Sequence, residues 1–285
     1  MKCGLKTLVL SLASASVFSA EAKDGCAYSS NIHGIVKVES QSTNVLIAVP
    51  WSFYTPDGSS TADMPIDHLV KPDALDDGDM LLSVTETHPQ KYEAWMLLKD
   101  AESGVGKWEP AITVSDGATA LLAETGLVSQ FRAKADAAIA RGFGLWLIRT
   151  NPKGDNGQWK PFYLYGQRAT NDVTVTVGGM VGADPNAIMI AYPFCSQAFN
   201  VNGGDVPWAN LGVNEQDTLS LPNGSDAWDL ALWDSDRKEW YVSKTVRTSS
   251  GRETQRIYNL TVPAGHGFWY VRRAPSPITI TFRAK

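Results

Sequence analysis

Cysteine and histidine are scarce in this sequence of 285 residues, which has three cysteines and four histidines. None of them has the partner spacing of a zinc site, which needs several thiolates or imidazoles close together. The sequence also contains no G-x-S-x-G, H-E-x-x-H, Walker or C-x-x-C motif. It therefore lacks the signatures of common hydrolases, metalloproteases, nucleotidases and thiol oxidoreductases. We expect no metal, no cofactor and no catalytic centre.

Positive charge is not in excess either. Lysine and arginine total 25 against 30 acidic residues, which gives a formal net charge of −5. This balance offers no electrostatic attraction for nucleic acid or for an anionic membrane surface. Hydrophobic residues make up 44% of the chain and charged residues 19%, which is typical of a globular protein. After the N-terminal segment, no run of about 18 apolar residues occurs, so we expect no integral membrane segment.

The N-terminal segment 1–22 has the features of an export signal. Lys2 and Lys6 precede an apolar stretch, Leu8 to Phe18, and Ala20-Glu21-Ala22 is a small-residue cleavage site. We expect cleavage after Ala22, with Ala20 as the alternative. The mature protein would then be secreted, periplasmic or attached to the cell surface.

Two cysteines, Cys26 and Cys195, would remain after cleavage. In an oxidising compartment they have only each other as disulfide partners. A bond between them and two separate thiols are both open from the sequence.

Short apolar runs bounded by turn residues predict a mostly β chain. Polar residues at 166–172 mark a boundary, so we predict repeats over 23–168 and 169–285. In the first repeat the strands are expected at 34–39, 44–51, 79–85, 92–99, 107–114, 143–149 and 159–165. In the second they are expected at 173–177, 187–194, 217–221, 228–233, 239–246, 257–262, 268–272 and 278–282.

The second half repeats the order of the first. Pro50 and Pro193 are 143 residues apart, Trp108 and Trp240 are 132 apart, and Trp146 and Trp269 are 123 apart. Trp95 and Trp228, 133 apart, are matched in the same way. An offset that falls along the chain is what collinear repeats with loop deletions produce. The predicted fold is therefore all-β, with two tandem sandwich or barrel-like repeats related by a pseudo-twofold axis.

The first repeat contains an extra segment with helical periodicity. Its apolar residues recur at steps of three and four, and Gly142 follows as a stop signal. These residues are Leu127, Val128, Phe131, Ala135, Ala138 and Ile139. We expect a helical insertion from about Leu121 to Arg141.

Each repeat ends in a similar segment. Residues 262–273 contain A-G-H-G-F-W-Y-V-R, and residues 140–149 are a degenerate copy. Together with an apolar run ending in proline, the Gly78-Asp79 pair and a tryptophan hairpin, this segment resembles a poorly characterised group of exported bacterial proteins with all-β repeats. The resemblance implies secretion and an all-β repeat but no activity. From the residues themselves, Gly265 and Gly267 are interpreted as turn residues, and Phe268 and Trp269 as the start of a core strand.

Tryptophan is abundant, with ten residues. Those at repeated positions are expected in the core, because large aromatic residues dominate core packing. The less symmetric ones, often beside turns, are the better candidates for an exposed aromatic surface that stacks on sugar rings. These candidate ligand-binding residues are Trp51, Trp159, Trp208 and Trp233.

Acidic residues cluster in two places. Residues 73–79 and the Asp234–Asp236 turn contain oxygen ligands that calcium prefers, but neither follows the D-x-D-x-D-G loop pattern. Solvated turn acids are the simpler interpretation. No carboxylate pair for glycoside hydrolysis can be selected, because its separation in space is not visible in the sequence.

The sequence thus predicts an exported, non-enzymatic structural or interaction protein of the cell envelope or extracellular space. Its partners would be proteins or glycans. A glycan-binding module that uses the exposed tryptophans is the alternative, and a glycoside-active enzyme is a third hypothesis.

Overall fold

The computed structural model describes residues 33–39, 41–48, 51–52, 64–65, 70, 75–87, 90–113, 119–121, 138–139, 141–168, 171–194, 198–223, 228–249 and 251–284. The expected export signal, Cys26 and Cys195 lie outside these residues. So does 122–137, which holds most of the expected helical insertion. The cleavage site, the disulfide and that helix therefore stay predictions.

The described residues form antiparallel strands and no α-helix, which confirms the all-β prediction. None of their helical turns is long and apolar enough to cross a membrane. In the N-terminal half (33–168) the strands are β1 (His33–Val38), β2 (Asn44–Ala48), β3 (Trp51–Ser52), β4 (Met64–Pro65), β5 (Met80–Thr87), β6 (Gln90–Lys99), β7 (Gly106–Thr113), β8 (Thr119–Leu121), β9 (Ala138–Ile139), β10 (Gly144–Ile148) and β11 (Phe162–Arg168). In the C-terminal half (171–284) they are β12 (Val173–Val177), β13 (Asn186–Ala191), β14 (Phe199–Asn200), β15 (Thr218–Pro222), β16 (Trp228–Asp234), β17 (Glu239–Thr248), β18 (Gly251–Ile257), β19 (Thr261–Val262), β20 (Gly267–Arg272) and β21 (Ile278–Phe282).

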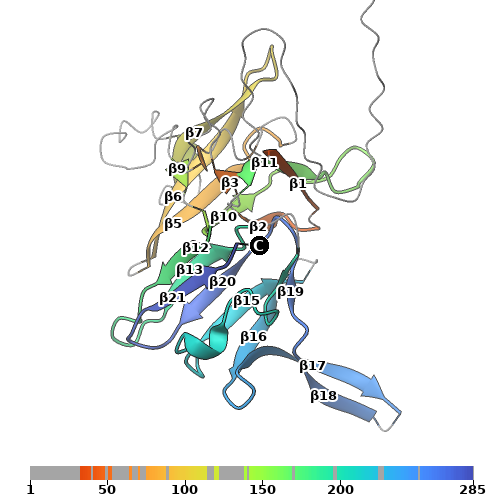
Figure 1. Ribbon diagram of the computed structural model, residues 1–285. Helices are drawn as coiled ribbons and strands as arrows, with labels where there is room; N and C mark the ends of the chain where they lie inside the picture. The colour runs from red at the N-terminus through yellow and green to blue at the C-terminus, as the bar shows by residue number, and fades with distance from the viewer. Residues whose placement is uncertain are drawn as a thin grey trace, which may run out of the picture.

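Each half is built on a six-stranded sheet (Figure 1). The strand orders are β2-β10-β5-β6-β7-β8 and β13-β20-β15-β16-β17-β18. A pair of strands that are distant in sequence accompanies each sheet: β1 with β11 in the first half and β12 with β21 in the second. The described sheets are open, so none of them forms a closed barrel.

These strand pairs cover one face of each sheet and enclose its core. In the first half, Val36 and Val38 of β1 and Phe162 and Leu164 of β11 pack in one cluster with sheet residues such as Trp108. In the second half, the sequence V-T-V-T-V of β12 alternates between buried valines and exposed threonines. Side chains alternate across a strand, so this pattern buries one face and leaves the other in water. Each half is therefore a two-layer β structure.

Between the halves, strand ends of each half make reciprocal contacts with the other. Ala48 N–H donates to the Gly265 carbonyl at 2.9 Å, and Ala191 N–H donates to the Gly142 carbonyl at 2.9 Å. Trp146 and Trp269 meet edge to face, with ring centroids 5.9 Å apart. The halves therefore share backbone hydrogen bonds and aromatic packing.

Two glycines make this junction possible. Gly142 has φ +86° and lies against β12, where a Cβ would come 2.6 Å from Val175 Cγ2. Gly265 has φ +77° and lies against β1, where a Cβ would come 2.7 Å from Val38 Cγ2. A side chain at either position would be strained by its backbone angle and would overlap a core valine. The interpretation of Gly265 as a turn residue is confirmed, and its close approach to the other half is a second reason for glycine.

A buried aspartate joins the start of one strand to the end of another in both halves. Asp217 accepts hydrogen bonds from Arg272 Nη1 at 2.5 Å, Tyr270 Oη at 2.8 Å and Arg273 N at 2.7 Å. Asp79 accepts from Thr150 N at 2.7 Å and Thr150 Oγ1 at 2.9 Å. Asp217 therefore holds the beginning of β15 against the end of β20. Asp79 holds the beginning of β5 against the residues that follow β10.

The arginines beside these acids differ. Arg272 is 2% exposed and forms an ion pair with Asp217. Arg149, 3% exposed, instead donates to the Lys160 carbonyl at 2.6 Å, and its Nε and Nη2 have no hydrogen-bond partner. Burial lowers the pKa of Arg149. Among the described residues, Asp79 and Arg149 therefore do not form an ion pair like that of Asp217 and Arg272.

The edges of the expected insertion are strands. Leu121 ends β8, and Ala138–Ile139 forms β9, paired with Met64–Pro65. The helical periodicity had continued through Ile139, so the expected C-terminal end of the helix is wrong. The conformation of this segment is determined by its pairing with β4. The periodicity of apolar residues within a segment does not indicate a strand partner that is distant in sequence.

We predict that Gly265→Ala destabilises the protein by about 1–3 kcal/mol, because the new methyl group overlaps Val38 in a packed core. Gly212→Ala is the matched control: Gly212 has φ +72° but nothing within 4 Å of the added Cβ. Thermal denaturation of both variants measures the difference. Equal melting temperatures for the two would show that close packing at the junction is unimportant.

We predict that Asp217→Asn costs about 3–5 kcal/mol, because it leaves the buried guanidinium of Arg272 without its counter-charge. Asp79→Asn is expected to cost about 1 kcal/mol, since Asp79 accepts from a hydroxyl and backbone amides only. Urea denaturation of both variants gives the two free energies of unfolding. A larger loss for the Asp79 variant would contradict this account.

Candidate functional site

The four candidate tryptophans do not form one surface. The backbone of Trp51 pairs with Arg168 in β11. Trp159 is half-buried in the N-terminal half, with Lys153 Nζ 5.1 Å from its ring centroid. Trp208 and Trp233 are in the C-terminal half, where both contact Trp240 at centroid distances of 5.7 Å and 5.2 Å. The structure therefore brings two of the four together, in a core cluster.

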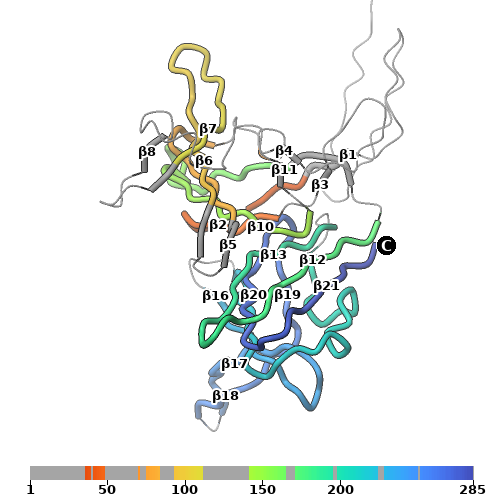
Figure 2. Tube along the Cα trace, turned by 90° about the vertical axis from the view of Figure 1, so that its left-hand side faces the viewer, coloured from red at the N-terminus to blue at the C-terminus, as the bar shows by residue number. Residues whose placement is uncertain are grey.

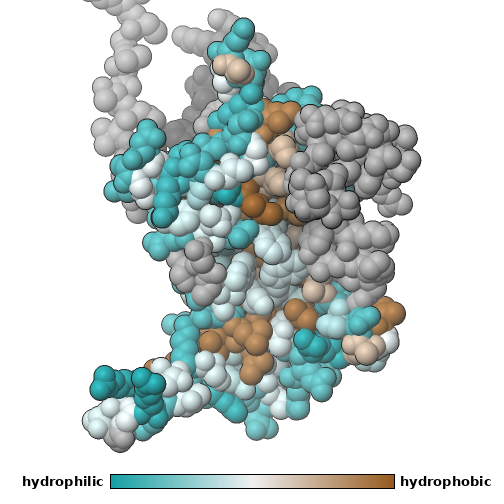
Figure 3. Space-filling view, turned by 180° about the vertical axis from the view of Figure 1, so that it is seen from behind, coloured by the Kyte–Doolittle hydropathy of each residue, from teal (hydrophilic) through white to brown (hydrophobic). Residues whose placement is uncertain are grey.

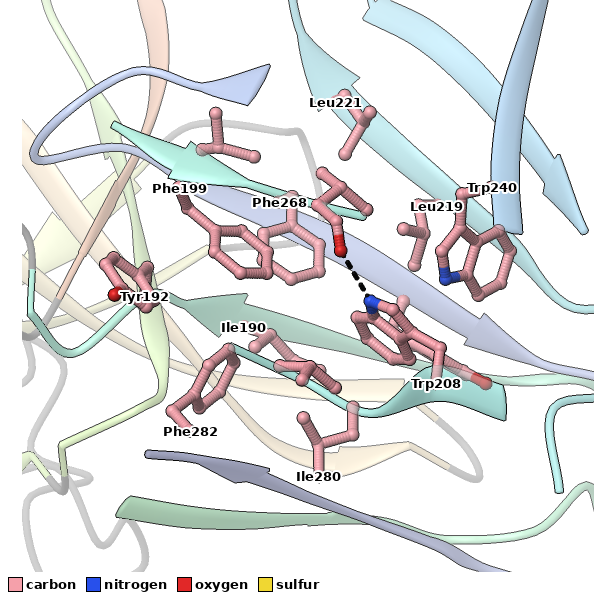
Figure 4. Packing of buried hydrophobic residues seen from close by; sticks show 14 of the residues in the cluster. Ile190, Tyr192, Phe199, Trp208, Leu219, Leu221, Trp240, Phe268, Ile280 and Phe282 are labelled. Carbon is pink, nitrogen blue, oxygen red and sulfur yellow. Dashed lines mark hydrogen bonds between the residues drawn. The ribbon is translucent and has the colours of Figure 1, made fainter. Parts of the chain in front are cut away.

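The expectation that Trp208 is exposed is wrong. Its side chain is 3% exposed, and its Nε1 donates to the Val201 carbonyl at 2.7 Å (Figure 4). It lies in a short 3₁₀ turn, Trp208–Asn210, that follows Pro207 and folds the ring back onto the sheet. A turn residue can thus be a core residue, and Trp208 offers no aromatic face to a ligand. Trp233 is half-buried and packs against the same core.

The acidic clusters are occupied by structural contacts. Asp76 forms an ion pair with Lys160 at 2.8 Å, and Asp77 Oδ1 accepts from Lys99 N at 2.8 Å. In the described part of the chain, no group of three or more histidines, cysteines or acids is placed to hold a metal ion. Among the described acids, these contacts support the interpretation of turn residues over that of calcium ligands.

The hairpin of β17 and β18 is largely exposed beyond its base. The strands pair from Val242 with Ile257 at the base to Thr248 with Gly251 at the tip. Val242 is buried, whereas the residues beyond it are exposed or half-exposed on both strands. Figure 1 shows this hairpin projecting from the rest of the described chain, and Figure 2 shows it at the end of the C-terminal half that lies away from the N-terminal half. We call residues 241–258 the ribbon.

One face of the ribbon contains arginine and no carboxylate. Residues directly opposite in the ladder point to the same face, as do residues two apart along a strand. We call this face the arginine face; it consists of Tyr241, Ser243, Thr245 and Arg247 from β17 and Arg252, Thr254 and Arg256 from β18. The opposite face contains Lys244 and Glu253. In a chain with a net charge of −5, the arginine face is a local concentration of positive charge.

Two of these arginines are placed directly opposite each other. Arg247 pairs with Arg252 in the ladder, an arrangement in which like charges are destabilising. The ion pairs on the ribbon and at its base join Lys244 with Asp229, Arg256 with Asp234, and Arg237 with Glu239. None of them includes Arg247 or Arg252. Their charges are therefore free to attract an anionic group.

The base of the ribbon is held by Asp234. Its Oδ2 accepts from Tyr258 Oη at 2.7 Å and Arg256 Nη1 at 2.8 Å. Its Oδ1 accepts from the backbone N–H groups of Asp236 and Arg237 at 3.1 Å each, which forms the predicted turn between β16 and β17. The hydrogen bond from Tyr258 lowers the pKa of Asp234 and raises the pKa of Tyr258. Asp234 thus stays ionised and fixes Arg256.

Cation–π contacts order the guanidinium groups further. Arg256 lies 4.5 Å from the ring centroid of Tyr241, and Arg237 lies 4.1 Å from that of Tyr258. A stacked guanidinium keeps its N–H groups at its edge, where they are available to acceptors. Arg256 is 57% exposed as a side chain, so these donors reach solvent.

An apolar patch adjoins the arginine face. Leu230 is 53% exposed, and Leu232 is the ladder partner of Tyr241. Ser220 pairs with both Leu230 and Trp269, so these residues lie on the same face of the sheet. Figure 3 shows the ribbon as a hydrophilic projection with an apolar patch on the body beside it. Tyrosine, tryptophan and arginine around an apolar centre are typical of binding surfaces.

Sequence reasoning missed this site. Residues 251–257 contain one apolar residue, so the pattern of a buried strand is absent and β18 was not predicted. The signal that was available is Arg252-x-Thr254-x-Arg256, an alternation that places two arginines on one face of any strand. It is a polar alternation, which is also typical of a loop.

We predict that Trp208→Ala destabilises the protein by about 3–5 kcal/mol, because it empties a core position and removes a buried hydrogen bond. Trp159→Ala is the comparison; it should cost less than about 1 kcal/mol, since the ring is half-buried, belongs to neither core cluster and has Lys153 Nζ 5.1 Å from its centroid. Chemical denaturation measures both. A similarly small loss of stability in both variants would contradict the assignment of Trp208 to the core.

Comparison of the chain with protein-family models, curated proteins and solved structures gives no match. The resemblance of the closing segment to exported bacterial repeat proteins therefore stays a prediction. The function has to be argued from the geometry of the ribbon and its surroundings.

Proposed function

We propose that this is an exported, non-enzymatic interaction protein that presents the ribbon to a partner. The observation that carries the proposal is the arginine face, a cationic surface on a hairpin that projects from a net acidic chain. The N-terminal segment supports export, as its charged start, apolar stretch and cleavage site are those of a signal peptide.

The positions of the ionisable groups support a binding role. Asp79 and Asp217 are buried and used in hydrogen bonds that join strands, so they are not available as acids or bases. Asp234 is used in fixing Arg256 and the hairpin turn. The exposed charges on the arginine face are donors of hydrogen bonds, which recognise acceptors but do not by themselves catalyse a reaction.

The proposal includes a tandem duplication of one β unit. The two sheet orders correspond strand by strand, and Trp146 in β10 and Trp269 in β20 occupy matching ladder positions, opposite Leu82 and Ser220. Gly142 and Gly265 make matching contacts with the opposite half. These correspondences support a pseudo-twofold relation between the halves.

The ladders correct one part of the sequence alignment. Trp95 lies opposite Leu81, whereas the corresponding Leu219 lies opposite Ala231. Trp228 instead lies opposite Pro222. The match of Trp95 with Trp228 is therefore wrong by three positions, because two tryptophans in corresponding strands were aligned by residue type alone.

The glycan-binding alternative has weaker support. It relied on exposed tryptophans, of which Trp208 is buried and Trp233 packs against the core. Trp159 is half-buried and belongs to neither core cluster, and the side chain of Trp51 lies outside the described residues. A response of the fluorescence of Trp159 to a polysaccharide, lost in Trp159→Ala, would favour that alternative.

A photo-cross-linking amino acid at Thr254 tests the proposed function in the native organism. We expect a specific adduct and co-fractionation with the cell envelope or the extracellular fraction. The same label at Val105, in the exposed turn between β6 and β7, is the matched control and should give no such adduct. Equal labelling at both sites, or a monomer without adducts in every fraction, would contradict a role for the ribbon.

A further inference from the structure

The outer edge of β18 has the properties of a strand-docking site. We propose that it binds an extended acidic peptide of a partner protein, which adds to the sheet as one more antiparallel strand. This inference rests on the proposed function and identifies the kind of partner that the ribbon takes.

The backbone of β18 supplies the first argument. β18 is the last strand in its sheet order and pairs with β17 on one side. Every second residue of an edge strand directs its N–H and C=O groups away from the sheet, where they can pair with an added strand. Figure 1 shows the ribbon projecting from the rest of the described chain, so an incoming peptide has access to this edge.

The side chains of β18 supply the second argument. Arg252 and Arg256 lie on the arginine face with Thr254 between them, and Glu253 lies on the other face. Opposite charges at directly facing positions of an antiparallel pair are stabilising. A complementary peptide therefore has acidic residues opposite both arginines, a threonine opposite Thr254 and a lysine opposite Glu253. In antiparallel order this is Glu-Gln-Thr-Lys-Glu.

The same pattern disfavours a second copy of this chain as the occupant. If two β18 strands paired about Thr254, Arg252 of each copy would face Arg256 of the other. Like charges directly opposite are destabilising, so the edge resists self-association while it remains open to an acidic strand. Charged edge strands commonly prevent aggregation, and here the charges also define which partner is accepted.

The contacts at the base of the ribbon orient the site in advance. Arg256 is held between Asp234 and the ring of Tyr241, so it loses little freedom when it binds a carboxylate. Arg252 has no such support and contributes charge alone. We therefore expect moderate affinity for a single peptide, with tighter binding where a partner presents several acidic strands.

The test uses the full chain and a fluorescent peptide containing Glu-Gln-Thr-Lys-Glu, with binding measured by anisotropy at low salt. Arg252→Glu should weaken binding at least tenfold, and a peptide with lysine opposite position 252 should restore it. Arg283→Glu is the matched control, because it makes the same change of charge at an exposed arginine that follows β21 and lies outside the ribbon. It should change the affinity less than threefold.

Two complementary peptides, N-methylated at alternate residues, test the backbone pairing. An added strand uses one edge of the peptide, so one N-methylated peptide should lose binding and the other should retain it. Equal binding of both, or equal loss for Arg283→Glu and Arg252→Glu, would overturn strand addition. Polygalacturonate provides the other arm: if it binds and Arg252→Glu weakens its binding as much as that of the peptide, the face binds polyanions and the peptide proposal is wrong.

The outcome is separable from that of the proposed function. Cross-linking at Thr254 without peptide binding would reject the acidic strand and retain the ribbon as an interaction surface. Thermal melting of each variant checks that the fold is intact, and Arg252 is fully on the surface of the ribbon. If the Arg252→Glu variant has a lowered melting temperature, its loss of peptide binding supports the proposal only when the peptide with lysine opposite position 252 restores binding. A ribbon that had unfolded could not bind that peptide.

Discussion

The close approach of Gly142 to β12 and of Gly265 to β1 is the contact on which the arrangement of the two halves depends. At each place a glycine with positive φ lies against a valine of the other half, and its carbonyl accepts a hydrogen bond from that half. A larger residue would push the strands apart, because packed interiors do not absorb an added methyl group freely. Trp146 and Trp269 also meet edge to face between the halves. The position of the ribbon relative to the N-terminal half follows from this junction.

Much of the strand pattern could be predicted from the sequence. Alternation at 173–177 and at 278–282 gave two strands at their observed bounds, because buried and exposed faces leave a period of two. The turns at 100–106 and at 234–239 were recognisable from glycine and aspartate. What periodicity could not give was the partner of each strand: Ala138–Ile139 continues a helical pattern and yet pairs with Met64–Pro65.

The candidate site was less predictable, for a related reason. Hydrophobic patterns report burial, and the ribbon is almost wholly exposed, so β18 left no such pattern. Conversely, Trp208 was expected at the surface because it follows a proline in a turn, whereas that turn directs the ring into the core. For Trp208, the neighbouring residues along the chain indicated the turn but not the burial of the ring. Exposure depended on tertiary contacts with strands that are distant in sequence.

The reciprocal junction has the form of an isologous dimer interface contained in one polypeptide. The segment between Arg168 and Val173 then acts as a short covalent tether, which gives each half a high effective concentration near the other. A free dimer of identical halves would carry two identical surfaces. Under the proposed duplication, tethering the halves permits their surfaces to diverge. The described strand β18 contains two arginines, whereas the described residues of β8, Thr119–Leu121, carry no charge.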